Sequence, residues 1–204
     1  MTGTGPIPGG TAGAVPGAAR TEPYRPLPDL RSLHAAIYDD WVVHGRRLQE
    51  PAFLAMATFR FGQWAISRQH RWARAIAGKT YGLLNVFVAG WTRVFIPPQT
   101  RIGREFHIVH CEGSISIHPA AVIGERFGVM HNVTIGTNMG PGAPVIGNDV
   151  FVGVNSCVLG AIRIGDRVRI GANTAVTTDV PDDCIAVGSP ARIMPRLGPL
   201  SRGS

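Results

Sequence analysis

Aliphatic residues recur at every sixth position through the second half of the chain. Glycine directly follows four of the six residues in the longest run, and the positions two before the next aliphatic are mostly small or β-branched. That run is Ile146, Val152, Val158, Ile164, Ile170 and Val176, and shorter ones are Ile96, Ile102, Ile108 and Ile117, Ile123, Val129, Ile135. Neither a helix nor an antiparallel strand has this period. It predicts a triangular coil of three short strands, with the aliphatic side chains stacked inside.

The six-residue spacing breaks at two places. Ile117 follows Ile108 by nine positions, and Ile146 follows Ile135 by eleven, instead of six. Residues 137–144, within the second break, are mostly Gly, Pro, Asn, Thr and Ala, which is typical of a loop. Because insertions in a regular solenoid form surface loops, often on its binding face, we expect the functional groups beside these breaks.

The chain before the repeats has a different pattern. Apolar spacings of three and four predict a helix that begins at Pro51 and continues through Ile66, and 30–43 and 72–88 are also predicted to be helical. We expect a tail at 1–28, disordered because it is rich in Gly and Pro, then helices over 29–92, the coil over 93–195 and a second tail at 196–204. Basic residues decorate the helices, namely Arg60, Arg68, Arg71, Arg74 and Lys79. A helical cap with a solvated polar face, compatible with oligomer contact, is favoured over contact with an anionic surface.

The charge and the cysteine content indicate which kinds of partner and which compartment to expect. The net charge of +7 and the pI of about 10.3 favour an anionic partner such as a phosphorylated cofactor, although a solvated basic surface explains them equally well. The sequence has no compact Lys/Arg run and no nucleic-acid motif, so nucleic acid is the least favoured partner. We expect no signal peptide and no transmembrane segment, since 83–91 is too short to span a bilayer. Three scattered cysteines predict a reducing, cytoplasmic compartment and no metal site.

Four motifs carry a resemblance to a known family: Ile-Gly-Arg-Glu-Phe-His-Ile-Val-His (102–110), His-Pro-Ala-Ala-Val-Ile-Gly (118–124), Val-Thr-Ile-Gly (133–136) and Val-Gly-Ser-Pro-Ala-Arg-Ile (187–193). With them, 94–194 resembles the hexapeptide-repeat acyltransferases, in particular their serine O-acetyltransferase-like branch. The resemblance implies a mainly β fold, a left-handed parallel β-helix. It also implies a homotrimer or dimer of trimers, with active sites between neighbouring subunits and acetyl-CoA as acyl donor.

The resemblance places the catalytic base at His110, beside the first break. A neutral imidazole there would take the proton of an acceptor hydroxyl as its oxygen attacks the thioester. His131, at a position where the family often has Gln or His, is a candidate for acceptor binding or a polar outer residue. Glu112 is a candidate for orienting the base. Cys111 has no separate activating base, so we favour a packing role for it over nucleophilic attack.

Two departures from the branch concern the acceptor. Serine acetyltransferases have an Asp where this chain has Phe95, and a His where it has Ala143. Both departures weaken L-serine as acceptor without weakening acetyl transfer. Serine, a related small metabolite and a sugar hydroxyl therefore remain open.

The resemblance also assigns a groove for CoA along the later coils. Small residues would let the pantetheine arm approach the backbone, and arginines would meet the phosphates. The matching residues are Gly153, Val154, Arg169, Gly171, Ala172, Pro190 and Arg192. Two other functions remain as alternatives: a non-catalytic β-helix scaffold or oligomerisation subunit, and a metal-dependent β-helix carbonic anhydrase using His107, His110 and His131. The spacing of these three histidines does not resemble the second family. His118 is expected to be a structural turn residue.

Overall fold

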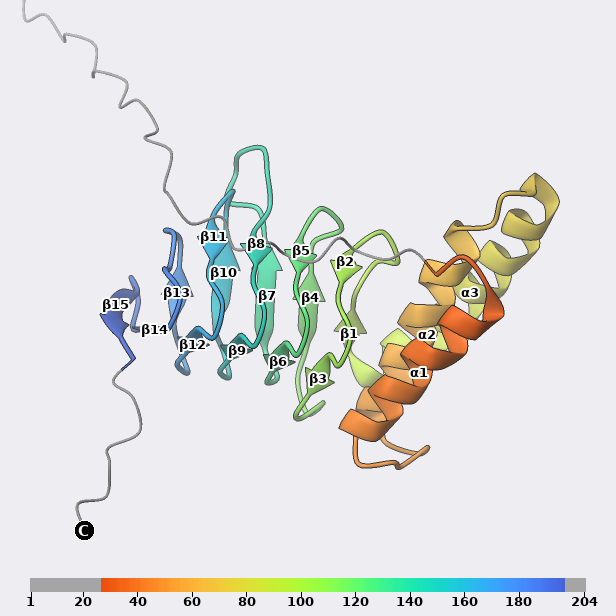
Figure 1. Ribbon diagram of the computed structural model, residues 1–204, viewed down its shortest axis with the longest axis horizontal. Helices are drawn as coiled ribbons and strands as arrows, with labels where there is room; N and C mark the ends of the chain where they lie inside the picture. Colours follow the sequence, from red (N-terminus) through yellow and green to blue (C-terminus); the bar gives the residue numbers. More distant parts are fainter. Residues whose placement is uncertain (1–26, 197–204) are drawn as a thin grey trace, which may run out of the picture.

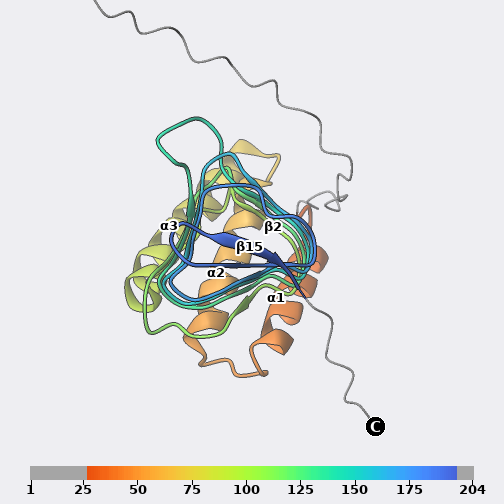
Figure 2. The same cartoon turned by 90° about the vertical axis from the view of Figure 1, so that its left-hand side faces the viewer.

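The computed structural model describes residues 27–196, which form a three-sided parallel β-helix with three α-helices at one end (Figure 1). The predicted tails lie outside the described residues except for Leu27, Pro28 and Arg196. Leu27 is buried against Leu33 and Ala36, so the packed structure begins before the first helix. The predicted parallel β-helix is confirmed, and Figure 2 shows its three sides in projection along the solenoid.

Each complete coil adds one short strand to each of three sheets. Sheet A contains β1 (Val94–Phe95), β4 (Ile115–Ile117), β7 (Val133–Gly136), β10 (Cys157–Leu159) and β13 (Ala175–Val176). Sheet B contains β2 (Arg101–Ile102), β5 (Val122–Ile123), β8 (Val145–Ile146) and β11 (Arg163–Ile164). Sheet C contains β3 (His107–Ile108), β6 (Gly128–Val129), β9 (Phe151–Val152), β12 (Arg169–Ile170), β14 (Cys184–Val187) and β15 (Arg192–Pro195). All pairs are parallel except β14 with β15, which folds back over the last coil.

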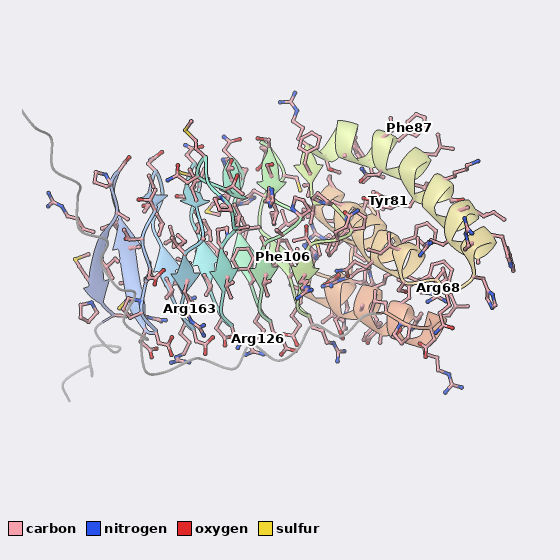
Figure 3. All side chains as sticks on the ribbon, turned by 90° about the horizontal axis from the view of Figure 1, so that it is seen from above. Arg68, Tyr81, Phe87, Phe106, Arg126 and Arg163 are labelled. Atoms are coloured by element: carbon pink, nitrogen blue, oxygen red, sulfur yellow. The ribbon has the colours of Figure 1, made fainter. Side chains whose placement is uncertain are left out.

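The residues of the six-residue repeat fill the interior. Ile146, Val152 and Val158 are fully buried, as are their counterparts one coil away. The positions two before the repeat residues also point inward: Phe106 and Phe127 stack with ring centroids 5.3 Å apart, and Phe106 is visible inside the solenoid in Figure 3. Burial of such apolar surface contributes about 25 cal/mol per Å², so the stacked columns are the main source of stability.

The three helices close the open end of the solenoid. They are α1 (Leu30–Val43), α2 (Pro51–Ile66) and α3 (Arg71–Thr92), which confirms all three predicted helices. Asp29 and Ser32 form a capping box at the start of α1, and Pro51 occupies the first turn of α2, where its missing N–H costs nothing. Met56 and Phe59 of α2 belong to the same buried cluster as the first coils. No helix in this described part is long and apolar enough to cross a membrane.

Arg60 corrects our interpretation of the basic residues on the helices. Its side chain is 4% exposed and pairs with the fully buried carboxylate of Asp40 at 2.8 Å. The same guanidinium donates to the backbone carbonyls of Ile102 (3.0 Å) and Gly103 (2.6 Å). A guanidinium has five N–H donors in a fixed fork, which suits it to join α1, α2 and the first coil at once. Arg60 is therefore a buried connector and not a solvated surface cation.

Corner residues with left-handed backbone stack between coils. Along the edge between sheets B and C these are Glu105, Arg126, Asp149, Arg167 and Asp183, whose charges alternate in sign. Arg126 donates to both carboxylate oxygens of Asp149, at 2.6 and 2.8 Å, and this pairing lowers the pKa of Asp149. Between sheets C and A the corner residues include Asn132, Asn155 and Asn173, and asparagine tolerates this backbone better than most residues. The edge between sheets B and C therefore has a ladder of alternating charges, and the edge between sheets C and A has a ladder of asparagine amides.

Candidate active site

The first break in the repeat forms a loop on the edge between sheets C and A. Residues 109–114 connect β3 to β4 there, and His110 is half exposed on this loop. The three additional residues let the loop bulge while Ile108 and Ile115 on either side stay buried. The break thus places a chemically active side chain on the surface of an otherwise regular solenoid.

Three predicted site residues come together on this edge. His110 Nδ1 lies 3.8 Å from Glu112 Oε2, and His131 Nδ1 lies 4.0 Å from the same oxygen. The two imidazole centroids are 6.3 Å apart, with the rings inclined at 64°. One carboxylate is thus shared between two imidazoles, one on each of two successive coils.

His131 has an unsatisfied polar atom. Its Nδ1 is buried and has no hydrogen-bond partner among residues 27–196. A buried nitrogen without a partner costs about 1–3 kcal/mol, because it has lost water and gained nothing in return. A bound molecule with a hydroxyl or ammonium group beside Glu112 would supply that partner.

The asparagine ladder supports the loop from below. The backbone N–H of Ser114 donates to Asn132 Oδ1 at 3.1 Å, and the Asn132 amide donates to Asn155 Oδ1 at 3.0 Å. A Cβ on Gly113 would lie 2.1 Å from Asn132 Oδ1, so only glycine lets the loop approach the ladder this closely. The asparagine ladder therefore fixes the position of the 109–114 loop, which contains His110.

Most of the predicted CoA residues continue the same edge. Strand pairing aligns Ile108, Val129, Val152 and Ile170 on successive coils. Two residues further on, this register stacks His110, His131, Val154 and Ala172, with Gly153 and Gly171 one residue earlier. The N–H of Asn155 donates to the His131 carbonyl and that of Asn173 to the Val154 carbonyl, which continues the stacking past the strands. The catalytic and donor candidates thus form one continuous strip.

The remaining predicted CoA residues divide into two groups. Arg192 pairs with Val187 in the last hairpin, and Pro190 lies in the intervening turn, at the far end of the strip. Arg169 instead turns towards the opposite edge of sheet C, where its Nη1 donates to the backbone carbonyl of Asp149. Its neighbours there are Arg126, Asp149 and His107, so the structure does not bring Arg169 together with the other CoA candidates.

His44 anchors the strand before His110, and the sequence analysis missed it. Its Nε2 accepts a hydrogen bond from the Ile108 N–H (3.2 Å), and its Nδ1 contacts the Asp40 carbonyl (2.6 Å). These two contacts require a neutral imidazole that donates from Nδ1. Its ring also meets the edge of His107 at a centroid distance of 5.4 Å. No sequence pattern indicates this contact, because it joins residues sixty-four positions apart.

Cys111 is poorly suited to nucleophilic attack. Burial, assisted by the nearby carboxylates of Glu50 and Glu112, raises the pKa of its thiol to about 11. The thiol therefore stays protonated at neutral pH, and the thiolate is the reactive form.

If the chain carries out the acetyl transfer that the sequence predicts, we expect Cys111→Ala to retain it within about twofold of wild type, because a protonated thiol contributes no nucleophile. Mass spectrometry after iodoacetamide treatment should show Cys111 alkylation accelerating continuously from pH 8 to pH 10. Rapid alkylation of Cys111 at pH 7, together with loss of activity in the alanine variant, would contradict this assignment.

The second break lies on a different edge of the solenoid. Residues 137–144 connect β7 of sheet A to β8 of sheet B and project from the solenoid (Figure 1). Sheet A therefore separates this loop from His110 within one chain. Phe95 lies half exposed on sheet A opposite Ser116, and Ala143 lies in the projecting loop. Neither side chain supplies the polar group that the resemblance predicts at that position.

Other histidines have separate surroundings. His118 Nδ1 accepts the N–H of Ala120 at 3.1 Å in a turn, in agreement with its predicted structural role. Residues 27–196 contain no cluster of three or more His, Cys, Asp or Glu side chains placed to hold a metal ion. The sharing of Glu112 by His110 and His131 is thus the main titratable arrangement on the candidate edge.

Comparison with known proteins shows which family the chain resembles. The family model for the bacterial transferase hexapeptide (six repeats) matches residues 143–178. The serine acetyltransferase of Synechococcus elongatus is 34% identical over 72% of this chain and 59% of its own length. The serine acetyltransferase of Helicobacter pylori is 41% identical over 50% of this chain and 60% of its own. The chain thus spans about three-fifths of the length of these curated relatives.

Solved structures extend the similarity to the fold. Soybean serine acetyltransferase, solved as the apoenzyme, superposes with a TM-score of 0.63 at 28% identity, covering 80% of this chain and 69% of that one. The resemblance to the hexapeptide-repeat acyltransferases and their serine O-acetyltransferase-like branch is therefore confirmed in sequence and in fold.

Proposed function

We propose that this chain, whose repeats, sequence and fold resemble the serine O-acetyltransferase-like branch of the hexapeptide-repeat acyltransferases, transfers an acetyl group from acetyl-CoA to a hydroxyl. One observation carries the proposal: an accessible imidazole, His110, lies beside the Glu112 carboxylate at the head of a strip of small residues. The similar proteins are serine acetyltransferases, and one with this fold was solved in complex with CoA.

His110 acts as general base in the proposed reaction. Its imidazole takes the hydroxyl proton while the acceptor oxygen attacks the acetyl carbonyl of the thioester. The tetrahedral intermediate collapses with cleavage of the C–S bond, and the imidazolium returns its proton to the CoA thiolate. Glu112, 3.8 Å away, favours the imidazolium as it forms and holds the ring. The proposal assigns stabilisation of the oxyanion to a backbone N–H of the 109–114 loop.

His131 contributes to acceptor binding in this proposal. Its buried, unpartnered Nδ1 and the nearby Glu112 carboxylate offer a hydrogen-bonding pair to an acceptor hydroxyl. The strip below it receives the donor: in this proposal the pantetheine arm lies along Val154 and Ala172, with the partly exposed Gly171 beside them. Pro190 and Arg192 lie at the far end, where the Arg192 guanidinium meets a phosphate.

The complete site requires a second subunit in this proposal. His110 lies on one edge of sheet A and the loop 137–144 on the other, so a neighbouring copy would bring its loop to this chain's His110. The outer side of α3 leads directly into sheet A and exposes large apolar side chains that suit a contact between copies. These side chains are Trp72, Ile76, Leu83, Val86, Phe87 and Trp91. A homotrimer, alone or paired as a dimer of trimers, satisfies this geometry.

An acceptor-dependent thiol-release assay tests the proposal. Purified protein with acetyl-CoA should release CoA thiol only when a hydroxyl acceptor is present, with L-serine and neutral sugars as the panel. Mass spectrometry should then detect an O-acetylated product. If no acceptor stimulates thiol release, the chain is a non-catalytic β-helix subunit and the proposed activity is wrong.

A further inference from the structure

A second surface feature adjoins the candidate active site on the outer face of sheet C. It is a groove of about 290 Å³, at the lower end of the range for ligand pockets. Its floor is Gly128, which pairs with His107 on one side and Phe151 on the other. A Cβ on Gly128 would lie 2.8 Å from Phe151 Cδ2. The Phe151 ring therefore leans over Gly128 and takes part of the space that a side chain there would fill, while His107 lies on the other side of Gly128.

The polar groups of the groove have balanced charge. Arg126 and Arg169 supply two cations, and Glu105 and Asp149 supply two anions. Arg126 and Asp149 already form a bidentate pair, so they present a fixed row of donors and acceptors. A groove with no net charge does not select a phosphate or a carboxylate. It suits a neutral molecule that carries several hydroxyl groups.

The remaining walls suit the carbon skeleton of such a molecule. Phe151 lies partly exposed over Gly128, and Val43 at the end of α1 closes one side. Burial lowers the pKa of His107, which keeps its ring neutral at neutral pH. A neutral imidazole both donates and accepts hydrogen bonds, as a hydroxyl partner requires. An aromatic wall with planar polar groups around it is the arrangement that a sugar ring fits.

The position of the groove sets the size of its ligand. His107 lines the groove and His110 follows three residues later, which is roughly 10 Å of extended chain. A single pyranose ring is too short to occupy the groove and also place a hydroxyl at His110. A glycan of two or more residues spans both.

We infer that the groove is an acceptor subsite, in which one neutral sugar residue of an oligosaccharide binds while the adjoining residue presents its hydroxyl to His110. This inference rests on the proposed acetyl transfer and names its acceptor class. It also accounts for Phe95 and Ala143, which remove two polar groups that serine acetyltransferases have. It assigns Arg169 to the acceptor and not to CoA.

Acceptor kinetics test this assignment. The panel contains neutral disaccharides built from glucose, galactose, mannose and N-acetylglucosamine, the corresponding monosaccharides, and L-serine. We expect a disaccharide to be the best acceptor. Arg169→Ala and Gly128→Ala should each raise its KM by about tenfold, while the KM for acetyl-CoA changes less than about twofold. Arg101→Ala is the matched control, since Arg101 faces outward from sheet B, away from the groove, and should change neither KM.

Three results would overturn the inference and leave the proposed function standing: L-serine or a monosaccharide as the best acceptor, unchanged kinetics in both groove variants, or a raised KM for acetyl-CoA in Arg169→Ala. If no acceptor releases thiol, the proposed function fails, and saturation-transfer NMR with the same disaccharides tests the groove alone. Binding that is lost in Gly128→Ala supports the groove as a sugar site, and absence of binding to the wild type overturns it.

Discussion

His110→Asn is expected to lower kcat for acetyl transfer by about 10²–10⁴-fold, the usual contribution of a general base. Asparagine retains hydrogen bonding but cannot take the proton of an attacking hydroxyl at neutral pH. The KM for acetyl-CoA should change little, because the donor residues of the strip begin two coils below His110, at Val154, and continue towards Arg192. Thiol release at saturating acetyl-CoA and acceptor measures kcat directly, and circular dichroism confirms that the variant is folded.

Two variants separate the general-base role from mere proximity. His118 lies in the turn after β4, where its imidazole accepts the backbone N–H of Ala120. His118→Asn therefore removes an imidazole that has no part in the proposed reaction, and it should leave kcat within about twofold of wild type. Glu112→Gln should lower kcat by less than His110→Asn, because it removes the carboxylate that favours the imidazolium but leaves the base in place. A kcat in His110→Asn close to that of wild type would refute the mechanism.

The solenoid could be predicted because each coil repeats the same physical problem. Every short strand must bury one aliphatic residue, so the six-residue spacing of Ile146, Val152 and Val158 is visible in the sequence. The breaks were informative for the same reason, since a regular core leaves extra residues no place except the surface. His110 and His131 meet because counting along aligned strands already stacks them. Glu112 lies near His110 because both belong to the short loop 109–114.

Contacts between the helices and the solenoid could not be predicted in this way. In the sequence Arg60 looks like the exposed arginines of the helical region, such as Arg71 and Arg74. Only the fold shows that it reaches the carbonyls of Ile102 and Gly103. Arg169 occupies a position that the resemblance assigns to CoA binding. Its guanidinium nevertheless donates to the Asp149 carbonyl at the opposite edge of sheet C. Both outcomes depend on side-chain direction between segments far apart in sequence. Periodicity contains no information about that direction.

Asp40→Asn is expected to lower the free energy of unfolding by about 3–5 kcal/mol, the usual cost of removing one partner from a buried ion pair. The Asp40 side chain is fully buried and the Arg60 side chain is 4% exposed, so water cannot replace the lost carboxylate. The guanidinium would keep its carbonyl partners, Ile102 and Gly103, but its charge would be buried without a counter-charge. Urea unfolding at a fixed protein concentration measures the change.

Asp39→Asn supplies the matched control from the adjacent position of α1. Asp39 also pairs with an arginine, Arg104, but that side chain is 59% exposed. Exposed pairs contribute about 0–1 kcal/mol, so this variant should unfold close to the wild-type midpoint. Two neighbouring aspartates, changed identically, then compare a buried ion pair with an exposed one. Equal losses in the two variants would show that the pair between Asp40 and Arg60 does not hold the helices onto the first coil, and a large loss confined to Asp40→Asn would show that it does.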